Sequence, residues 1–312
     1  MSRLSRSVAA SVLLLALLPA CASSAPTNGS ALGDDAITVG SFNFPESVLL
    51  GELYAQALET AGYRVVRELN LGTRELVAPA VIRGLVELVP EYSGSALEFV
   101  AGPGTASPDP KITSAALAAE LASRNIVALD PSPAEDRNGV VVTAETAAAL
   151  HLTTLSDLAR VSETLTFGGP PECPARPLCL IGLETAYGIH FGTVVSLDEG
   201  GPLTVAALLA GDIDVGLLFT SDGAIRTNDF VLLEDDRHLQ PAENITPVLR
   251  PEVLARFGDG VAVVLNAVSA ELTTEDLRAM NASVVSGVTP AEVAAAWLTT
   301  HGFRGIESPP GV

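Results

Sequence analysis

The chain is poor in basic residues, and this shortage excludes a class of partners. It holds 17 lysines and arginines against 37 aspartates and glutamates among 312 residues, for a formal net charge of -20. Nucleic acids and anionic lipid headgroups are bound through patches of Lys and Arg, so we expect neither as a partner. The negative field favours cationic ligands weakly, because salt screens it, and it equally serves to keep a protein soluble.

Sequence signatures of catalysis are also missing. There is no G-x-S-x-G, no G-x-x-x-x-G-K-[ST], no H-E-x-x-H and no G-x-G-x-x-G after a strand. Paired acids occur at Asp212 and Asp214 and at Asp235 and Asp236. Asp212 and Asp214 would share one strand face and could bind a cation, but a turn that leads into a strand uses Asp for the same geometry, so we interpret this pair as structural. We expect no enzymatic activity, no cofactor and no metal.

No apolar run is long enough to span a bilayer, which needs about 20 residues. The longest near the start, Val8 to Leu18, follows Arg3 and Arg6 and ends at Cys21, a pattern typical of a secretory signal. We predict a signal peptide over 1–20. A cysteine directly after a small residue resembles a bacterial lipobox, which would make Cys21 a lipid-anchored N-terminus. An ordinary cleaved signal is the alternative. Residues 21–35 are small and polar, as in a flexible tether.

Only Cys173 and Cys179 follow Cys21, and they share a proline-rich stretch. In an oxidising compartment two cysteines this close indicate a local disulfide, whose small loop limits its effect on global stability. A metal site is the rival interpretation. It is weak, because none of the four histidines stands at ligand spacing from either sulfur.

Strand and helix patterns alternate along the chain. Apolar runs predict strands at 37–40, 63–69, 85–89, 140–143, 164–167, 193–197, 215–219 and 261–265, and helical spacing predicts helices at 47–61, 74–83, 114–123, 203–210 and 274–285. Thr154 and Thr289, each with an acid three residues later, predict capping boxes. Such alternation implies mostly parallel sheets covered by helices, with ligands at the carboxyl ends of strands.

Several segments in register resemble the glycine betaine/choline (osmoprotectant) substrate-binding proteins of ABC transporters. The resemblance is carried, in order, by Ile37 to Glu46, Gly51 to Glu59, Asn70 to Glu75, Pro90 to Ser95, Phe219 to Gly223 and Leu232 to His238. It implies the type II periplasmic-binding fold, two α/β lobes joined by two crossings with a ligand cleft between them. It also implies ABC permease and ATPase subunits as partners of a monomeric, extracytoplasmic protein.

The resemblance further implies a cage of aromatic rings around a quaternary ammonium group, because a desolvated ring face attracts a cation by about 2 kcal/mol. Here that cage is incomplete: Phe219 replaces a usual tyrosine and Phe42 stands in the place of a lysine. Such changes favour a cation without a carboxylate, or a larger ligand, over a zwitterion. The residues expected to line the site are Phe42, Asn43, Tyr92, Ser95, Asn138, Gly139, Arg176, Phe219 and Glu243.

The domain organisation follows from the same pattern. The polar, proline-containing stretches 131–138 and 237–244 are candidates for the crossings, which places lobe 1 at 36–138 and 241–312 and lobe 2 at 139–240. We predict a lipid-anchored protein that closes around one small solute. An exported enzyme on the same scaffold and a ligand-sensing surface lipoprotein without transport are the alternatives.

Overall fold

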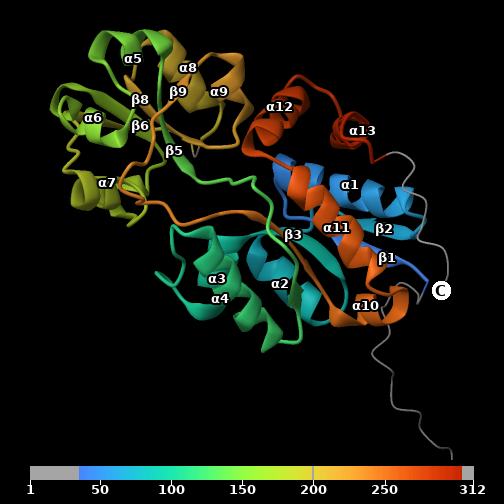
Figure 1. Cartoon of the computed structure of the whole chain (residues 1–312). Helices are drawn as coiled ribbons and strands as arrows, with labels where there is room; N and C mark the ends of the chain where they lie inside the picture. Colours follow the sequence, from blue (N-terminus) through green and yellow to red (C-terminus); the bar gives the residue numbers. More distant parts are fainter. Residues whose placement is uncertain (1–34, 199, 304–312) are drawn as a thin grey trace, which may run out of the picture.

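The computed structural model describes residues 35–198 and 200–303, which form two α/β lobes (Figure 1). The predicted signal peptide, Cys21 and nearly all of the predicted tether lie outside the described residues.

Lobe 1 is built on a five-stranded sheet in the order β2-β1-β3-β10-β4, in which β2, β1 and β3 are parallel and β10 runs antiparallel to both neighbours. Its strands are β1 (Ile37–Gly40), β2 (Val65–Glu68), β3 (Leu88–Tyr92), β4 (Val127–Ala128) and β10 (Ile245–Leu249). Its helices are α1 (Pro45–Thr60), α2 (Arg74–Ile82), α3 (Ser93–Ala101), α4 (Pro110–Ala122), α10 (Pro251–Phe257), α11 (Gly260–Glu271) and α13 (Pro290–Thr300).

Lobe 2 repeats this plan with the order β7-β6-β8-β5-β9, where β7, β6 and β8 are parallel and β5 is antiparallel to both neighbours. Its strands are β5 (Asn138–Val142), β6 (Thr166–Gly169), β7 (Thr193–Ser196), β8 (Val215–Phe219) and β9 (Val231–Leu232). Its helices are α5 (Ala144–Leu150), α6 (Leu155–Ala159), α7 (Leu180–Tyr187), α8 (Pro202–Ala210) and α9 (Gly223–Thr227), with 3-10 turns at Ser162–Thr164 and Cys173–Ala175.

Local sequence signals account for most of these elements. The two predicted capping boxes form at Thr154 and Thr289, and a third forms at Thr273. The paired acids are structural, as expected for the first pair: Asp214 accepts the backbone N–H of Thr166 at 2.8 Å, and Asp236 accepts that of Ser156 at 3.1 Å.

One predicted strand is wrong. Residues 261–265 belong to helix α11, not to a strand. The buried side chains of α11 include Val261, Val264, Leu265 and Val268, which are spaced i, i+3, i+4 and i+7. The five apolar residues therefore belong to a longer helical pattern that continues beyond the run.

The chain passes between the lobes twice, once from β4 to β5 and once from β9 back to β10 (Figure 1). The two segments lie side by side, because Glu135 pairs with Asn244 in an antiparallel bridge and Asp136 donates its backbone N–H to the Glu243 carbonyl at 3.1 Å. The two crossing segments are therefore held to each other by backbone pairing where the chain passes between the lobes.

Helix α12 (Thr274–Val285) makes a further connection between the lobes. Arg278 donates from Nε to the Thr220 carbonyl at 2.6 Å, and Glu275 forms an ion pair with Arg226 of α9. A Cβ at Gly223 would collide with the backbone of Ala282, so only glycine permits this approach of α9 to α12. The C-terminal part of the chain thus touches both lobes.

Within the described ranges, no single helix has the length and apolar character needed to cross a membrane. Only Pro251–Phe257 and Gly260–Glu271 taken together meet that test, and they are bent by 118° at the break between them.

Candidate functional site

A cleft of about 950 Å³ lies between the lobes. It is lined at the carboxyl ends of β1, β3 and β8, the place where open α/β sheets bind ligands. The lining residues are Phe42, Asn43, Phe44, Pro45, Glu46, Thr73, Arg74, Glu75, Tyr92, Ser95, Asp136, Arg176, Gly200, Gly201, Pro202, Phe219, Ser221, Asp222, Gly223, Asn281, Val284 and Val285.

Three aromatic rings of lobe 1 line the cleft. The Phe42 and Phe44 rings are stacked with centroids 6.0 Å apart, and the Phe44 and Tyr92 centroids are 5.8 Å apart. Phe42 and Tyr92 are buried, whereas Phe44 is exposed. The Phe42 backbone N–H donates to the Ser47 hydroxyl at 2.9 Å, which fixes the turn from β1 into α1. The three rings form an apolar surface of the kind that binds organic cations.

Two carboxyl groups lie beside this ring surface. Glu46, in the first turn of α1, accepts hydrogen bonds from the Tyr92 hydroxyl at 2.8 Å and from Asn281 Nδ2 at 2.5 Å. Asp136, in the first crossing, accepts from the Ser221 hydroxyl at 2.7 Å. Burial raises the pKa of both carboxyls, since a low-dielectric environment disfavours the charged form.

Arg74 also lines the cleft, but its charge is already balanced. Its guanidinium donates to both Glu91 oxygens, with Nη2 at 3.0 Å from Oε2, and lies 5.1 Å from the centre of the Phe42 ring. The arginine therefore holds the Phe42 ring in place, and its attraction for a ligand anion is weakened by Glu91.

Lobe 2 contributes a smaller and more open surface. Phe219, at the end of β8, is half-buried, and a Cβ at Gly200 would lie 3.2 Å from its ring. Gly200 also has a φ of 69°, in the left-handed region, so glycine is needed there on both grounds. The backbone of lobe 2 thereby approaches the Phe219 ring closely.

Two helix N-termini beside the cleft hold the chain's own carboxylates. Asp198 accepts the backbone N–H groups of Leu203 and Thr204 at the start of α8, both at 2.9 Å. Asp222 accepts from Ala224 N–H at 2.7 Å at the start of α9. Helix N-termini are natural sites for anionic ligand groups, and these two are occupied by side chains.

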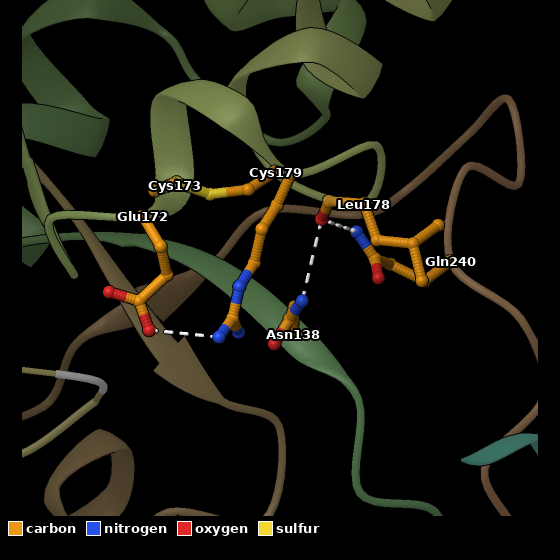
Figure 2. The surroundings of a disulfide bond; sticks show 7 residues. Asn138, Glu172, Cys173, Leu178, Cys179 and Gln240 are labelled. Atoms are coloured by element: carbon orange, nitrogen blue, oxygen red, sulfur yellow. Dashed lines mark hydrogen bonds and ion pairs between the residues drawn. A yellow bond between two sulfur atoms is a disulfide. The ribbon is translucent and has the colours of Figure 1, made fainter. Parts of the chain in front are cut away.

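The predicted disulfide is present between Cys173 and Cys179, whose Cα atoms are 5.3 Å apart (Figure 2). Both cysteines are buried in the lobe 2 core. In the loop that they close, the Leu178 carbonyl accepts from Asn138 Nδ2 at 3.4 Å and from Gln240 Nε2 at 2.9 Å. The loop also carries Arg176, which lines the cleft and pairs with Glu172 at 2.8 Å.

The structure brings six of the predicted site residues together on the cleft wall, namely Phe42, Asn43, Tyr92, Ser95, Arg176 and Phe219. The other three lie behind it. Asn138 ties β5 to the disulfide loop, and a Cβ on Gly139 would collide with the Leu232 side chain.

Glu243 lies behind Ser95, where its oxygens accept the Ser95 backbone N–H at 3.0 Å and the Ser95 hydroxyl at 2.5 Å. Burial raises the pKa of Glu243 to about 7, against the opposing effect of these hydrogen bonds. Glu243 is thus a support for the N-terminus of α3 and not part of the cleft lining.

The sequence reasoning missed several lining residues, above all Phe44, Glu46, Asp136 and Asn281. Phe44 and Glu46 stand inside the segment that carries the family resemblance, and Asp136 lies in a predicted crossing, so a signal existed for each. Asn281 comes from a helix far along the chain, and no local pattern points to it.

A second hollow of about 610 Å³ lies on the outer side of lobe 1 and is lined by residues of α1, β2 and α13. Its one arginine, Arg67, is already paired with Glu52 at 3.0 Å and Glu59 at 2.6 Å, and no aromatic ring lines it. Among residues 35–198 and 200–303, no group of three or more His, Cys, Asp or Glu side chains is placed to hold a metal ion.

Comparison with known proteins agrees with this geometry. Residues 35–300 match the family described as the substrate binding domain of ABC-type glycine betaine transport system. The chain is 28% identical over 278 residues to the glycine betaine-binding protein YehZ of Escherichia coli (strain K12), covering 86% of this chain and 91% of that protein. It is 29% identical over 283 residues to a glycine-betaine-binding protein of Pseudomonas aeruginosa, covering 86% and 88%.

Among solved structures, that of a glycine betaine/carnitine/choline ABC transporter matches with a TM-score of 0.80 at 25% identity, covering 86% of this chain and 99% of the other. The predicted type II periplasmic-binding fold is thereby confirmed, together with the predicted absence of enzymatic function in this family. The chain belongs to the family of substrate-binding domains of ABC-type glycine betaine transport systems.

Proposed function

We propose that this chain is the extracytoplasmic, lipid-anchored solute-binding subunit of an ABC importer, and that it captures a small organic cation of the choline class between its lobes. One moving unit would comprise 36–138 and 241–312, and the other 139–240, closing as a hinge. The closed form would be delivered to the permease, with the ATPase driving import. The lipid anchor is proposed from the sequence around Cys21 alone.

The observation that carries the ligand class is the pairing of rings with acids on one wall of the cleft. Phe42, Phe44 and Tyr92 offer ring faces, and the Glu46 carboxyl accepts a hydrogen bond from the Tyr92 hydroxyl. A ring whose hydroxyl donates to a carboxylate becomes more electron-rich, which strengthens its attraction for a cation.

The ligand preference within the family follows from the partners that the described charged groups of the cleft already have. Arg74 is engaged by Glu91, Arg176 is paired with Glu172, and the N-termini of α8 and α9 are occupied by Asp198 and Asp222. A ligand carboxylate would have to displace one of these acids or lie near Glu46. We therefore expect choline to bind more tightly than glycine betaine, whose carboxylate has no free partner of this kind.

A thermal-shift experiment with a panel of choline, glycine betaine, carnitine, proline betaine and ergothioneine tests the function. A ligand that binds only the folded state stabilises it by about 2.7 kcal/mol at a hundredfold excess over Kd, which gives a clear rise in Tm. We expect the largest shift with choline. No shift with any of the five at millimolar concentration would contradict the proposed function.

A further inference from the structure

Side chains from distant parts of the chain form a hydrogen-bonded network in the lining of the cleft. Tyr92 and Asn281 donate to the two oxygens of Glu46, and Asn281 also donates to the Ser221 carbonyl at 3.0 Å. The Ser221 hydroxyl in turn donates to Asp136. Glu46 and Asp136 are thus joined through neutral side chains that come from lobe 1, the first crossing, lobe 2 and α12.

The hydrogen bonds that Glu46 and Asp136 accept from Tyr92, Asn281 and Ser221 come from neutral donors, and the surrounding charges add negative potential. Asp222 acts on Glu46, and Glu243 acts on Asp136, in each case with like charge. Three arginines of the adjoining segments have other partners: Arg74 pairs with Glu91, Arg137 with Glu135, and Arg278 with the Thr220 carbonyl and Glu275. Tyr92 is a further titratable neighbour, and burial holds its pKa well above the ordinary value, so its hydroxyl stays protonated.

Glu46 is buried and Asp136 is half-buried, and two neighbouring carboxyls resist ionising together because like charges disfavour the charged form. Burial is the largest cause for Asp136 and the charge of Glu46 is the next. Both Glu46 oxygens accept hydrogen bonds from side chains, and Asp136 accepts hydrogen bonds from the hydroxyl and the backbone N–H of Ser221. A single proton is therefore shared between the two carboxyls.

We propose that Glu46 and Asp136 form a proton-exchanging cation subsite of the cleft, which holds one proton when empty and releases it to solvent when an organic cation binds. Both residues line the cleft next to the ring surface, so a bound cation supplies the positive charge that the proton otherwise provides. This inference rests on the proposed function and adds to it a pH dependence of ligand capture. No bond other than the O–H bond of the carboxyl is broken.

The consequence is a ligand affinity that rises with pH. Where one proton leaves for each cation bound, Kd falls about tenfold per pH unit until the pair is fully ionised, and above that point it no longer changes. The direction is set by the raised pKa values of both carboxyls: at low pH the proton competes with the cation.

The test is isothermal titration calorimetry of choline in buffers of different ionisation heat, at pH values from about 5.5 to about 8.5. The slope of the observed heat against buffer ionisation heat counts released protons, and we expect up to one per choline. Asp136→Asn mimics the protonated carboxyl. It should abolish the release and weaken binding at the high pH, with little change at the low pH.

Glu145→Gln, an acid exposed on α5 and away from the cleft, is the charge-matched control and should behave as the unchanged chain. Choline binding without proton release in the unchanged chain would overturn this inference and leave the proposed function standing. Absence of binding for every cation of the panel would overturn both. Since the unchanged chain alone decides between these outcomes, the test holds even if Asp136→Asn fails to fold.

Discussion

The two lobes share one strand order but present different surfaces to the cleft. Lobe 1 contributes Phe42, Phe44 and Tyr92 with Glu46 beside them, whereas lobe 2 contributes one half-buried ring, Phe219, close to Gly200. The sheets are equivalent in topology, with the antiparallel strand fourth in each. The difference therefore lies in the side chains that follow the strands, and we propose from it that lobe 1 supplies most of the binding energy while lobe 2 closes over the ligand.

The largest effect is expected at Tyr92. Tyr92→Ala removes a ring face, worth about 2 kcal/mol for a desolvated cation, and leaves Glu46 without one hydrogen bond, at a cost of about 1 to 3 kcal/mol. Choline affinity should fall by about a hundredfold or more. Calorimetric titration measures it.

The matched controls for this prediction are Tyr92→Phe, which keeps the ring, and Phe219→Ala on the opposite wall. Each should weaken choline binding less than Tyr92→Ala does. Tyr92→Phe loses only the hydrogen bond to Glu46, at a cost of about 1 to 3 kcal/mol, and Phe219→Ala loses a more exposed ring that contributes about 0.5 to 1 kcal/mol. A larger loss at Phe219 than at Tyr92 would reverse the proposed division between the lobes.

Removing the disulfide should destabilise lobe 2 selectively. The double variant Cys173→Ala, Cys179→Ala opens a loop with a sequence separation of 6 residues. Chain entropy predicts a loss of about 2 kcal/mol in the free energy of unfolding. Hydrogen exchange should show faster opening at β5 and α7 than in lobe 1. Uniform acceleration in both lobes would mean that they unfold as one unit.

The raised pKa of Glu243 predicts that the stability of lobe 1 depends on pH. Its pKa in the folded chain is raised to about 7, so its contribution to stability is complete below the unfolded value near 4.5 and is lost as pH rises through 7. Glu243→Gln, which keeps an acceptor for the Ser95 N–H, should remove part of the fall in Tm between about pH 5 and about pH 8. An unchanged fall in Tm would assign it to other groups.

The smallest effect is expected at the ion pair between α9 and α12. Arg226 and Glu275 have side chains that are 55% and 58% exposed, and exposed pairs contribute about 0 to 1 kcal/mol. Arg226→Ala should change the free energy of unfolding by less than about 1 kcal/mol in denaturant titration. Its control is Arg160→Ala, which breaks an ion pair with Asp157 inside lobe 2; the Arg160 side chain is 63% exposed and that of Asp157 19%. A clearly larger loss at Arg226 would mean that α12 holds the lobes together through this contact.

The sequence allowed the α/β alternation, the crossings and the position of the cleft to be predicted, because period-two and helical patterns are local. It failed at 261–265, where a short apolar run gave no sign of the longer helix around it. It could not separate Ser95, on the cleft wall, from Glu243 directly behind it, because burial of a side chain depends on packing between distant segments. The Glu46 and Asp136 arrangement likewise arises only when four segments meet.

The most direct test is a calorimetric comparison of choline and glycine betaine on the same protein, since both carry the trimethylammonium group and only betaine carries a carboxylate. The account predicts that choline binds at least about tenfold more tightly, a difference of about 1.4 kcal/mol. Equal or tighter binding of glycine betaine would show that the cleft receives a carboxylate after all, and would contradict the assignment of lobe 1 as a surface for carboxylate-free cations.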